Sequence, residues 1–181
     1  ETVWEFRASD EISSSPAVQD GVAYFGSFDG VFHAIDAQAG TEIWSVDTGT
    51  SIHSSPAVLD GVVYFGNYGG TLLALDAETG DEIWRIEGGE QISSSPAIAD
   101  GILVYSDVAG AIRGVQVSDG TVLWETYSPG SIFASAAISD GIVVVGDFVG
   151  NINALSLTDG TFVWQNFIDA EIYPSAAISD G

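Results

Sequence analysis

The chain has 181 residues, 46% of them hydrophobic, and 26 acidic residues against 3 basic ones give it a net charge of −23. This charge argues against nucleic acids and anionic membranes as partners, because both bind through several Lys or Arg side chains. No apolar run approaches the roughly 18 residues that span a bilayer, so we expect no membrane insertion, and the absence of Cys excludes disulfides and thiolate metal sites.

An internal repeat of 40 residues runs through the chain without insertion or deletion. Its tryptophans are Trp4, Trp44, Trp84, Trp124 and Trp164. Also recurring are Gly40, Gly80, Gly120 and Gly160, the serines Ser15, Ser55, Ser95, Ser135 and Ser175, and Asp-Gly pairs from Asp20-Gly21 to Asp180-Gly181. The sequence predicts one domain over residues 1–181, with copies at about 5–44, 45–84, 85–124 and 125–164 and a partial copy at 165–181.

Each copy is predicted to form four short strands, as the second copy illustrates in chain order. Its strands are Ile52–Val58, Val62–Gly66, Thr71–Asp76 and Glu82–Ile86. The Asp-Gly pair between the first two strands is a strong hairpin signal, because both central residues of that turn take positive φ. Gly-rich residues 67–70 and 78–80 form the next two turns.

The middle strands of each copy carry consecutive apolar residues, such as Val62-Val63-Tyr64-Phe65. Strands with this pattern are buried on both faces. Four-stranded units of this length, covered on both sides by further sheets, indicate the blades of a β-propeller. We therefore predict an all-β fold with four full antiparallel blades, to which a solenoid or a sandwich of the same period is the alternative.

The third turn of the second copy carries a family resemblance. Residues 74–84 read Ala-Leu-Asp-Ala-Glu-Thr-Gly-Asp-Glu-Ile-Trp, which resembles the tryptophan-docking motif Ala-x-Asp-x-x-Thr-Gly-x-x-x-Trp of pyrroloquinoline-quinone-like (PQQ-like) propeller repeats. The departures are Ala39 in the first copy, Gly114 and Gln116 in the third, and Ser156 and Asp159 in the fourth. We expect the third and fourth copies to close this turn less tightly. The resemblance implies that the five tryptophans, beside the small residues of the motif, tie neighbouring blades together.

The same resemblance covers quinoprotein dehydrogenases and non-enzymatic relatives such as the propeller lipoprotein of bacterial outer-membrane assembly. A quinone site needs Arg or Lys for the carboxylates of the cofactor and an acidic and amide cluster for Ca²⁺. The chain offers only Arg7, Arg85 and Arg113, none in such a context, and His33 and His53 share no metal-ligand spacing. We expect no catalytic residue, metal or cofactor in this segment; PQQ and Ca²⁺ would belong to a full-length dehydrogenase. Arg7 and Arg85 are expected to pair with nearby Glu, and Arg113 to lie on a blade flank or at the surface.

One face of the predicted propeller carries the loops from each fourth strand to the next first strand and from each second strand to the third; we call it the loop face. Two series of equivalent positions vary on it: Ser13, His53, Ser93, Phe133 and Tyr173, and Phe28, Tyr68, Val108 and Phe148. Variation among otherwise regular copies, near the mouth of the channel, indicates a partner surface. The candidates are His53, Phe133, Tyr173, Phe28, Tyr68 and Phe148. The alternative is that these side chains only cover the blade ends.

These features predict a non-enzymatic scaffold that presents its loop face for binding of a protein or a ligand, with a protein as the expected partner. A fragment of a quinoprotein dehydrogenase is the competing hypothesis, and a purely structural module is the third. The charge and the absence of Lys make the chain similar to proteins of salt-loving archaea, in which hydrated carboxylates keep the surface soluble at high salt. We expect a halophile protein at or outside the cell surface, with a cytoplasmic location left open.

The strand count predicts that the blades do not close into a ring by themselves. The fourth strand occurs five times because Trp4 opens the chain, and the first strand occurs five times because Ile172–Ile178 ends it. A fifth blade would therefore lack its middle strands. We expect an excerpt of a ring of seven or eight blades, as in the family it resembles, or an arc that a second copy closes.

Overall fold

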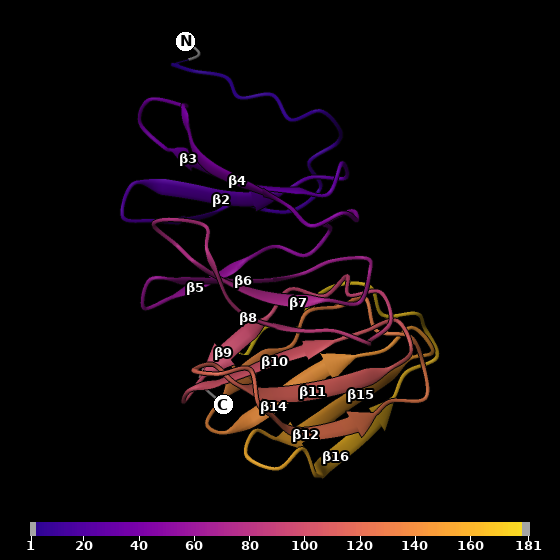
Figure 1. Ribbon diagram of the computed structural model, residues 1–181. Coiled ribbons are helices and arrows are strands. Elements are labelled where there is room, and N and C mark those ends of the chain that lie inside the picture. Colours follow the sequence, from indigo (N-terminus) through magenta and orange to yellow (C-terminus); the bar gives the residue numbers. More distant parts are fainter. Residues whose placement is uncertain (1–2, 179–181) are drawn as a thin grey trace.

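The computed structural model describes residues 3–178, and every regular element of this part of the chain is a β-strand (Figure 1). The first sheet contains β1 (Ala17–Gln19), β2 (Val22–Gly26), β3 (Val31–Asp36) and β4 (Glu42–Asp47). The second contains β5 (Ala57–Leu59), β6 (Val62–Gly66), β7 (Leu72–Asp76) and β8 (Glu82–Ile86). The third contains β9 (Ala97–Ala99), β10 (Ile102–Ser106), β11 (Ala111–Gln116) and β12 (Val122–Tyr127). The fourth contains β13 (Ala137–Ser139), β14 (Ile142–Gly146), β15 (Asn151–Ser156) and β16 (Phe162–Phe167).

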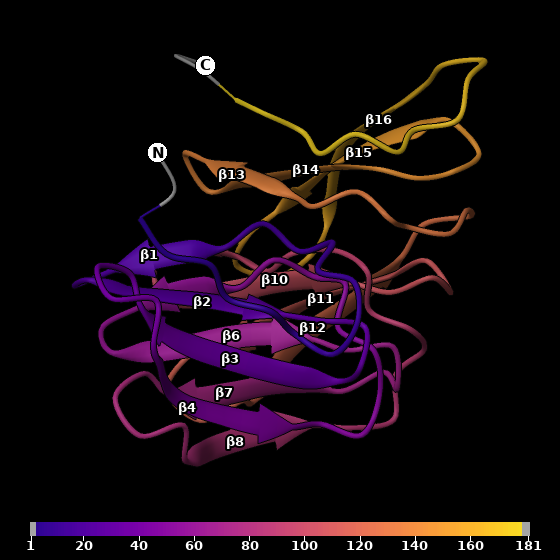
Figure 2. The ribbon, with the colours of Figure 1, turned by 90° about the horizontal axis from the view of Figure 1, so that it is seen from above.

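Each sheet is an antiparallel meander whose strands pair in sequence order. The sheets follow one another as an open arc (Figures 1 and 2). Their first strands approach each other, β1 against β5 and β9 against β13, and their fourth strands form the outer edge. The prediction of an all-β fold with four-stranded propeller blades is confirmed. Among residues 3–178 no helix has the length and apolarity that a membrane span requires.

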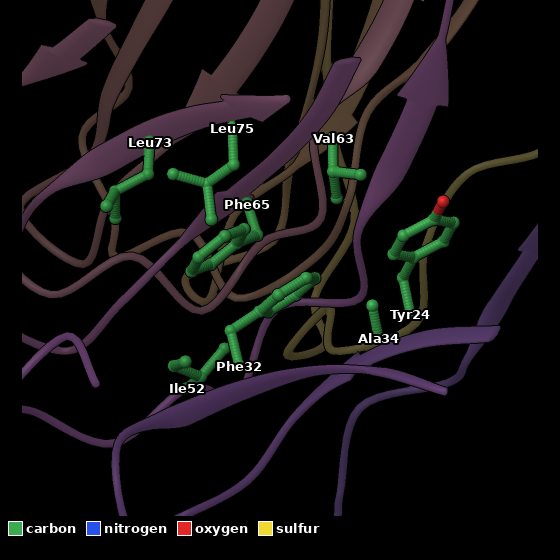
Figure 3. Close-up of a cluster of buried hydrophobic side chains, with 8 residues drawn as sticks. All are labelled: Tyr24, Phe32, Ala34, Ile52, Val63, Phe65, Leu73 and Leu75. Carbon is green, nitrogen blue, oxygen red and sulfur yellow. The ribbon is translucent and has the colours of Figure 1, made fainter. Parts of the chain in front are cut away.

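The cores lie between consecutive blades. Between the first two, the rings of Phe32 and Phe65 stack with centroids 3.9 Å apart (Figure 3). Around them lie Tyr24, Ala34, Ile52, Val63, Leu73 and Leu75 (Figure 3). Equivalent clusters separate the second blade from the third and the third from the fourth. Each such Phe, Leu or Ile contributes about 1.5–3 kcal/mol by burial, and packing on both faces explains the unbroken apolar runs of the middle strands.

The hairpins between first and second strands have the predicted conformation. The aspartates Asp20, Asp60, Asp100 and Asp140 have φ between 49° and 51°, and the glycine after each also has positive φ. Asp and Gly are the residues that this turn selects, because both tolerate the left-handed region. The fifth pair, Asp180-Gly181, lies outside the described residues.

The first strand of each blade is shorter than predicted. We expected Ile52–Val58 in the second copy, but β5 contains only Ala57–Leu59. The Ser54 hydroxyl donates to the Gly66 carbonyl and accepts from the Gly66 N–H, both at 2.8 Å, so a side chain replaces the strand's ladder bonds there. Ile52 turns into the core, where a Cβ added to Gly26 would lie 2.2 Å from its Cγ2 atom.

The serines that recur every 40 residues link the segments just before the first strands of neighbouring blades. The N–H groups of Ser15, Ser55, Ser95 and Ser135 donate to the hydroxyls of Ser55, Ser95, Ser135 and Ser175, at 2.8, 3.0, 2.8 and 3.1 Å. Each bond runs from one blade to the next along the chain. Four blades are therefore joined by a polar ladder as well as by their apolar cores.

The third turns close alike in all four blades, so the expected loosening in the third and fourth is not seen. The N–H groups of Gly40, Gly80, Gly120 and Gly160 donate to the carbonyl four residues earlier at 2.7, 2.9, 3.0 and 2.9 Å. In the first two blades the carboxylates of Asp36 and Asp76, at the start of the turn, accept backbone N–H groups. Gln116 and Ser156 replace them in the third and fourth blades, where the carboxylates of Asp119 and Asp159, at the end of the turn, accept instead.

Candidate functional site

Four of the five tryptophans lie on the third turn of the copy that follows them in the chain. The Nε1 of Trp44 donates to the Ala77 carbonyl at 3.1 Å, and a Cβ added to Gly80 would lie 2.8 Å from the Trp44 ring. The same arrangement joins Trp4 to Ala37 and Gly40, Trp84 to Val117 and Gly120, and Trp124 to Leu157 and Gly160. Position 80 therefore needs glycine for two reasons: the Trp44 ring leaves no room for a Cβ atom, and the backbone has a positive φ of 77°.

Exposure of these tryptophans depends on their place in the arc. Trp84 and Trp124 are 9% and 7% exposed, whereas Trp4 and Trp164 are 36% and 43% exposed. The first two lie between two described blades. Trp164 lies on the outer face of the fourth blade, by which we mean the face that no other described blade covers.

The side chain of Tyr24 reinforces the contact between Trp44 and the third turn of the second blade. The Tyr24 hydroxyl donates to the same Ala77 carbonyl at 3.1 Å. Burial, with the Asp20 and Asp76 carboxylates nearby, raises the pKa of Tyr24, so the hydroxyl keeps the proton that it donates. The motif gives no sign of this bond, because Tyr24 lies twenty residues before Trp44 in a run that only indicates a core strand.

The loop face brings the six candidate aromatics into two groups. In the first, the ring centroids of Phe28 and Tyr68 each lie 5.7 Å from that of His53 and 6.3 Å from each other. In the second, the centroid separations among Phe133, Phe148 and Tyr173 are 5.8, 5.9 and 5.0 Å. Ser93 and Val108 occupy the equivalent positions between the groups. Five of the six are half-buried, and Tyr173 is 56% exposed.

Backbone bonds between adjacent loops fix these positions. The N–H groups of Phe28, Tyr68 and Phe148 donate to the carbonyls of Glu11, Ser51 and Ser131 at 2.9, 2.9 and 2.8 Å. Each loop between second and third strands is thus tied to the loop that enters its own blade. The aromatic groups therefore stand on an ordered support rather than on free loop tips.

Two buried carboxylates below the loop face were not predicted. Asp107 and Asp147 occupy the position of Ser27 and Asn67 and are 1% and 0% exposed. Asp147 accepts from the Ser128 hydroxyl at 2.5 Å, and also from the Asn151 amide and three backbone N–H groups. Burial opposes its charge, but the bonds from Ser128 and Asn151 prevail and hold the pKa of Asp147 below its ordinary value. Comparing this position along the repeat could have indicated a turn cap, since Asn67, Asp107 and Asp147 accept backbone N–H groups of the turn. In the first copy Ser27 donates to Asp29, which accepts the backbone N–H instead.

Arg113 lies on the flank of the third blade and is mostly buried. Its Nη1 lies 2.7 Å from an Asp107 oxygen and its Nε 2.5 Å from a Glu125 oxygen, and its guanidinium lies 5.6 Å from the centre of the Tyr105 ring. Burial opposes the charge, but the bond to Asp107 and the nearby anionic groups raise the pKa of Arg113. The flank position agrees with the sequence interpretation.

The remaining cations and histidines are dispersed. Arg7 pairs with Glu5 at 3.0 Å, and Arg85 pairs with Glu82 and Glu87, as predicted. Buried His33 has its Nδ1 2.8 Å from a Glu42 oxygen, and its ring meets Phe6 and Phe25. His53 belongs to the first aromatic group, so the structure does not bring the two histidines together.

A quinone with its calcium ion does not fit the described residues. The Arg side chains that the carboxylates of the cofactor would need are already paired with carboxylates of the chain. Within residues 3–178 no group of three or more His, Asp or Glu side chains is placed to hold a metal ion. We derive no chemistry through this cofactor for the segment.

Meander blades, a constant repeat length and tryptophans that bridge consecutive copies define a segment of β-propeller built from PQQ-like repeats. The family model described as outer membrane protein assembly factor BamB matches residues 1–51 and 29–178, and the chain belongs to this family. No curated protein sequence matches the chain significantly.

Solved structures share the fold at low sequence identity. The computationally designed Ika8 protein superposes with a TM-score of 0.82 at 21% identity, over 91% of this chain and 52% of its own. Quinohemoprotein alcohol dehydrogenase from Comamonas testosteroni gives 0.78 at 20% identity, over 89% and 35%. BamB from Moraxella catarrhalis gives 0.72 at 18% identity, over 91% and 64%. The chain thus spans less than two thirds of the length of each of these proteins, and the similarity is one of fold.

Proposed function

We propose that the chain is a non-enzymatic β-propeller scaffold that binds a protein partner at its loop face. The observation that carries this proposal is the gathering of Phe28, His53 and Tyr68, and of Phe133, Phe148 and Tyr173, into two partly exposed groups on ordered loops. Large aromatics on a rigid support are the usual anchors of protein interfaces. The description of the family as an outer membrane assembly factor supports a place at or outside the cell surface.

The charge of the chain defines the partner's chemistry. Carboxylates are frequent on the loops of this face, at Asp10, Glu11, Asp29, Glu90, Asp169 and Glu171, and Asp47 ends β4 just before one of these loops. Each Arg of the chain is paired internally. A segment with Arg or Lys beside apolar side chains complements this surface, because a cation can lie over an aromatic ring and near a carboxylate together. The partner we propose is a basic, partly apolar protein segment.

Site-specific cross-linking tests this face. A photoreactive phenylalanine analogue at Phe148 should capture a basic protein from an extract in molar KCl, whereas the same analogue at Glu78, on the opposite face, should not. The purified partner should then bind the double variant His53→Ser, Tyr68→Val about tenfold more weakly or worse. These substitutions copy Ser13 and Val108 of other blades, so the fold should be kept.

The control is Glu78→Thr, which copies Thr158 on the opposite face and should leave the affinity unchanged. Equal capture at both faces, or an affinity that follows Glu78 and ignores the loop aromatics, would contradict the proposal.

We also propose that further blades, of the same protein or of a second copy, cover the two ends of the arc in a ring of seven or eight blades. Two observations support this. A cavity of about 190 Å³ on the outer face of the first blade is lined by Trp4, Phe6, Ile12, Pro16, Ala23, Phe25 and Ile35. At the other end Trp164 is 43% exposed, although Trp124 is 7% exposed under the next blade. Light scattering tests the idea, because a compact monomer that binds no hydrophobic dye would contradict it.

A fragment of a quinoprotein dehydrogenase is the second candidate, supported by the fold shared with the quinohemoprotein alcohol dehydrogenase. Titration with pyrroloquinoline quinone and Ca²⁺ separates the two candidates. The scaffold hypothesis expects no saturable change in quinone absorbance and no shift in melting temperature. Saturable binding to this segment would favour the dehydrogenase.

A further inference from the structure

Each blade ends in an outer strand that pairs on one side only. The strands β4, β8, β12 and β16 are last in their sheets. Such an edge offers unpaired N–H and C=O groups to another strand, and proteins commonly protect it with charged side chains. Differences in charge among the four outer strands therefore decide which edge another chain can approach.

Only β16 lacks charge among the four outer strands of the described residues. Asp47 ends β4, Arg85 lies in β8 with Glu87 directly after it, and Glu125 lies in β12. By contrast, β16 reads Phe-Val-Trp-Gln-Asn-Phe. In a chain with a net charge of −23, this is an unusual place to have no carboxylate.

All six residues of β16 are exposed. Val163 is 52% exposed, close to the 48% of Ile83 and the 44% of Leu123 at the same position, and the blades of those two residues are covered on both faces. The exposure of Val163 therefore belongs to the outer strand itself, whereas Trp164 is exposed because no described blade covers its face. Phe167 is 66% exposed, where the equivalent residues of the first two copies are acidic.

The pairing of β16 with β15 shows which part of the edge is regular. Ala154 pairs with Trp164 and Leu155 with Phe162, so that Val163 is the extra residue of a bulge. A bulge interrupts the edge locally. Beyond it, Trp164–Phe167 keeps continuous pairing with β15 and presents a regular, charge-free edge.

We propose that β16 pairs with β16 of a second copy, edge to edge and antiparallel, through Trp164–Phe167. Antiparallel pairing of identical strands places a twofold axis at their centre, so a single surface suffices for both partners. The same arrangement would bring carboxylates near the twofold axis at β4, which ends in Asp47, and at β12, which has Glu125 at the position of Gln165; like charges across strands are destabilising. This association concerns the outer edge and is independent of both the loop face and the closure of the arc.

Salt governs this association. Two chains of equal negative charge repel, and the repulsion is screened over about 10 Å at 0.1 M salt and about 3 Å at 1 M. Edge pairing alone buries less area than a standard interface. We therefore expect a weak dimer that forms at high protein concentration, up to about 1 mM, and strengthens with salt.

Sedimentation equilibrium on the whole chain tests the proposal, with KCl raised from about 0.1 to about 2 M to span the screening range. The wild type should dimerise increasingly with salt. The double variant Gln165→Glu, Phe167→Asp copies Glu125 and Asp47 of other outer strands, so it should fold as before and stay monomeric. The reciprocal variant Ser45→Gln, Asp47→Phe gives β4 a charge-free regular edge and should form larger assemblies.

A wild type that is monomeric at every salt concentration, or an edge variant that dimerises like the wild type, would overturn the proposal. Dimerisation that survives the edge variant but is lost on Phe25→Ser, at the outer face of the first blade, would assign the contact to closure of the arc instead. Hydrogen exchange supplies a readout that needs no variant: backbone amides in Trp164–Phe167 should gain protection as protein concentration rises. Unchanged protection would count against the pairing.

Discussion

At the scale of single residues, one position shows how the repeat accommodates different chemistry. Buried His33, Leu73 and Asn153 and mostly buried Arg113 are equivalent side chains on the third strands. Most of their groups have local partners: the Asn153 oxygen accepts from Gln165 at 2.6 Å, Leu73 joins an apolar core, and Arg113 and the Nδ1 of His33 meet carboxylates, while the Nε2 of His33 is buried without a partner among the described residues. A polar side chain is tolerated between blades because the copy that carries it also carries a hydrogen-bonding or charged partner for it.

Trp84 should contribute to stability rather than to partner binding. Its ring is 9% exposed and its Nε1 donates to the Val117 carbonyl at 3.0 Å. Trp84→Ala should lower the free energy of unfolding by about 3–5 kcal/mol through the cavity and the lost bond, measured by urea denaturation in molar salt. Trp164→Ala, at a side chain 43% exposed, should cost much less. Equal losses would contradict the contacts described for Trp84.

Asp147 should make the fourth blade sensitive to acid. Because its pKa is lower folded than unfolded, its contribution to stability is fully present above the unfolded value of about 3.9 and is lost as the pH falls through the folded value. Asp147→Asn, which copies Asn67, should cost about 2 kcal/mol at neutral pH, because hydrogen bonds to a buried charge are lost. The difference from wild type should shrink below about pH 4. Asp140→Asn, at an exposed turn, should stay within about 0.5 kcal/mol of wild type throughout.

At the scale of elements, the second, third and fourth strands of the second copy could be predicted almost to the residue. Their alternation of apolar runs with Gly-containing turns has one physical interpretation, a sheet buried on both faces. The first strand could not be bounded, because Ser54 and Ile52 look like strand residues in sequence. Only the structure shows that Ser54 replaces ladder bonds with its side chain.

Part of the candidate site could likewise be predicted from the sequence, and part could not. That the loop aromatics vary among equivalent copies is visible in the sequence, and so is their common face. Their grouping into Phe28, His53 and Tyr68 on one side and Phe133, Phe148 and Tyr173 on the other depends on which loops of adjacent blades meet. The burial of Asp147 could not be predicted either, since acidic residues are abundant and mostly exposed in this chain.

Ser54→Ala should loosen the start of the second blade's first strand. The hydroxyl bonds both the N–H and the carbonyl of Gly66 in a buried site, so its removal leaves these groups unpaired at a cost of about 2 kcal/mol. Amides of residues 52–55 should exchange faster by mass spectrometry. The fourth blade, which has Ala134 at this position, should show the faster exchange without any substitution; slow exchange there would contradict the explanation.

At the scale of the whole molecule, crowding 26 carboxylates on one chain with 3 basic residues should make folding depend on ionic strength, as proposed for a halophile. Screening lengths fall from about 10 Å at 0.1 M to about 3 Å at 1 M salt, so repulsion between neighbouring turns should decline over this range. The melting temperature by circular dichroism should therefore rise as KCl increases from about 0.1 to about 3 M. A flat series would contradict the halophile proposal.

Two series of hydrogen bonds between blades recur at fixed sequence offsets, 33 residues from tryptophan to carbonyl and 40 from serine to serine. Excision of one whole copy, such as residues 45–84, would bring Trp44 to the Val117 carbonyl that Trp84 now uses, and Ser15 to the hydroxyl of Ser95. Such a junction keeps both recurring series of hydrogen bonds between blades. The chain is therefore modular, and whole blades are the units in which a gene of this kind can lengthen or shorten by duplication and deletion without redesigning an interface.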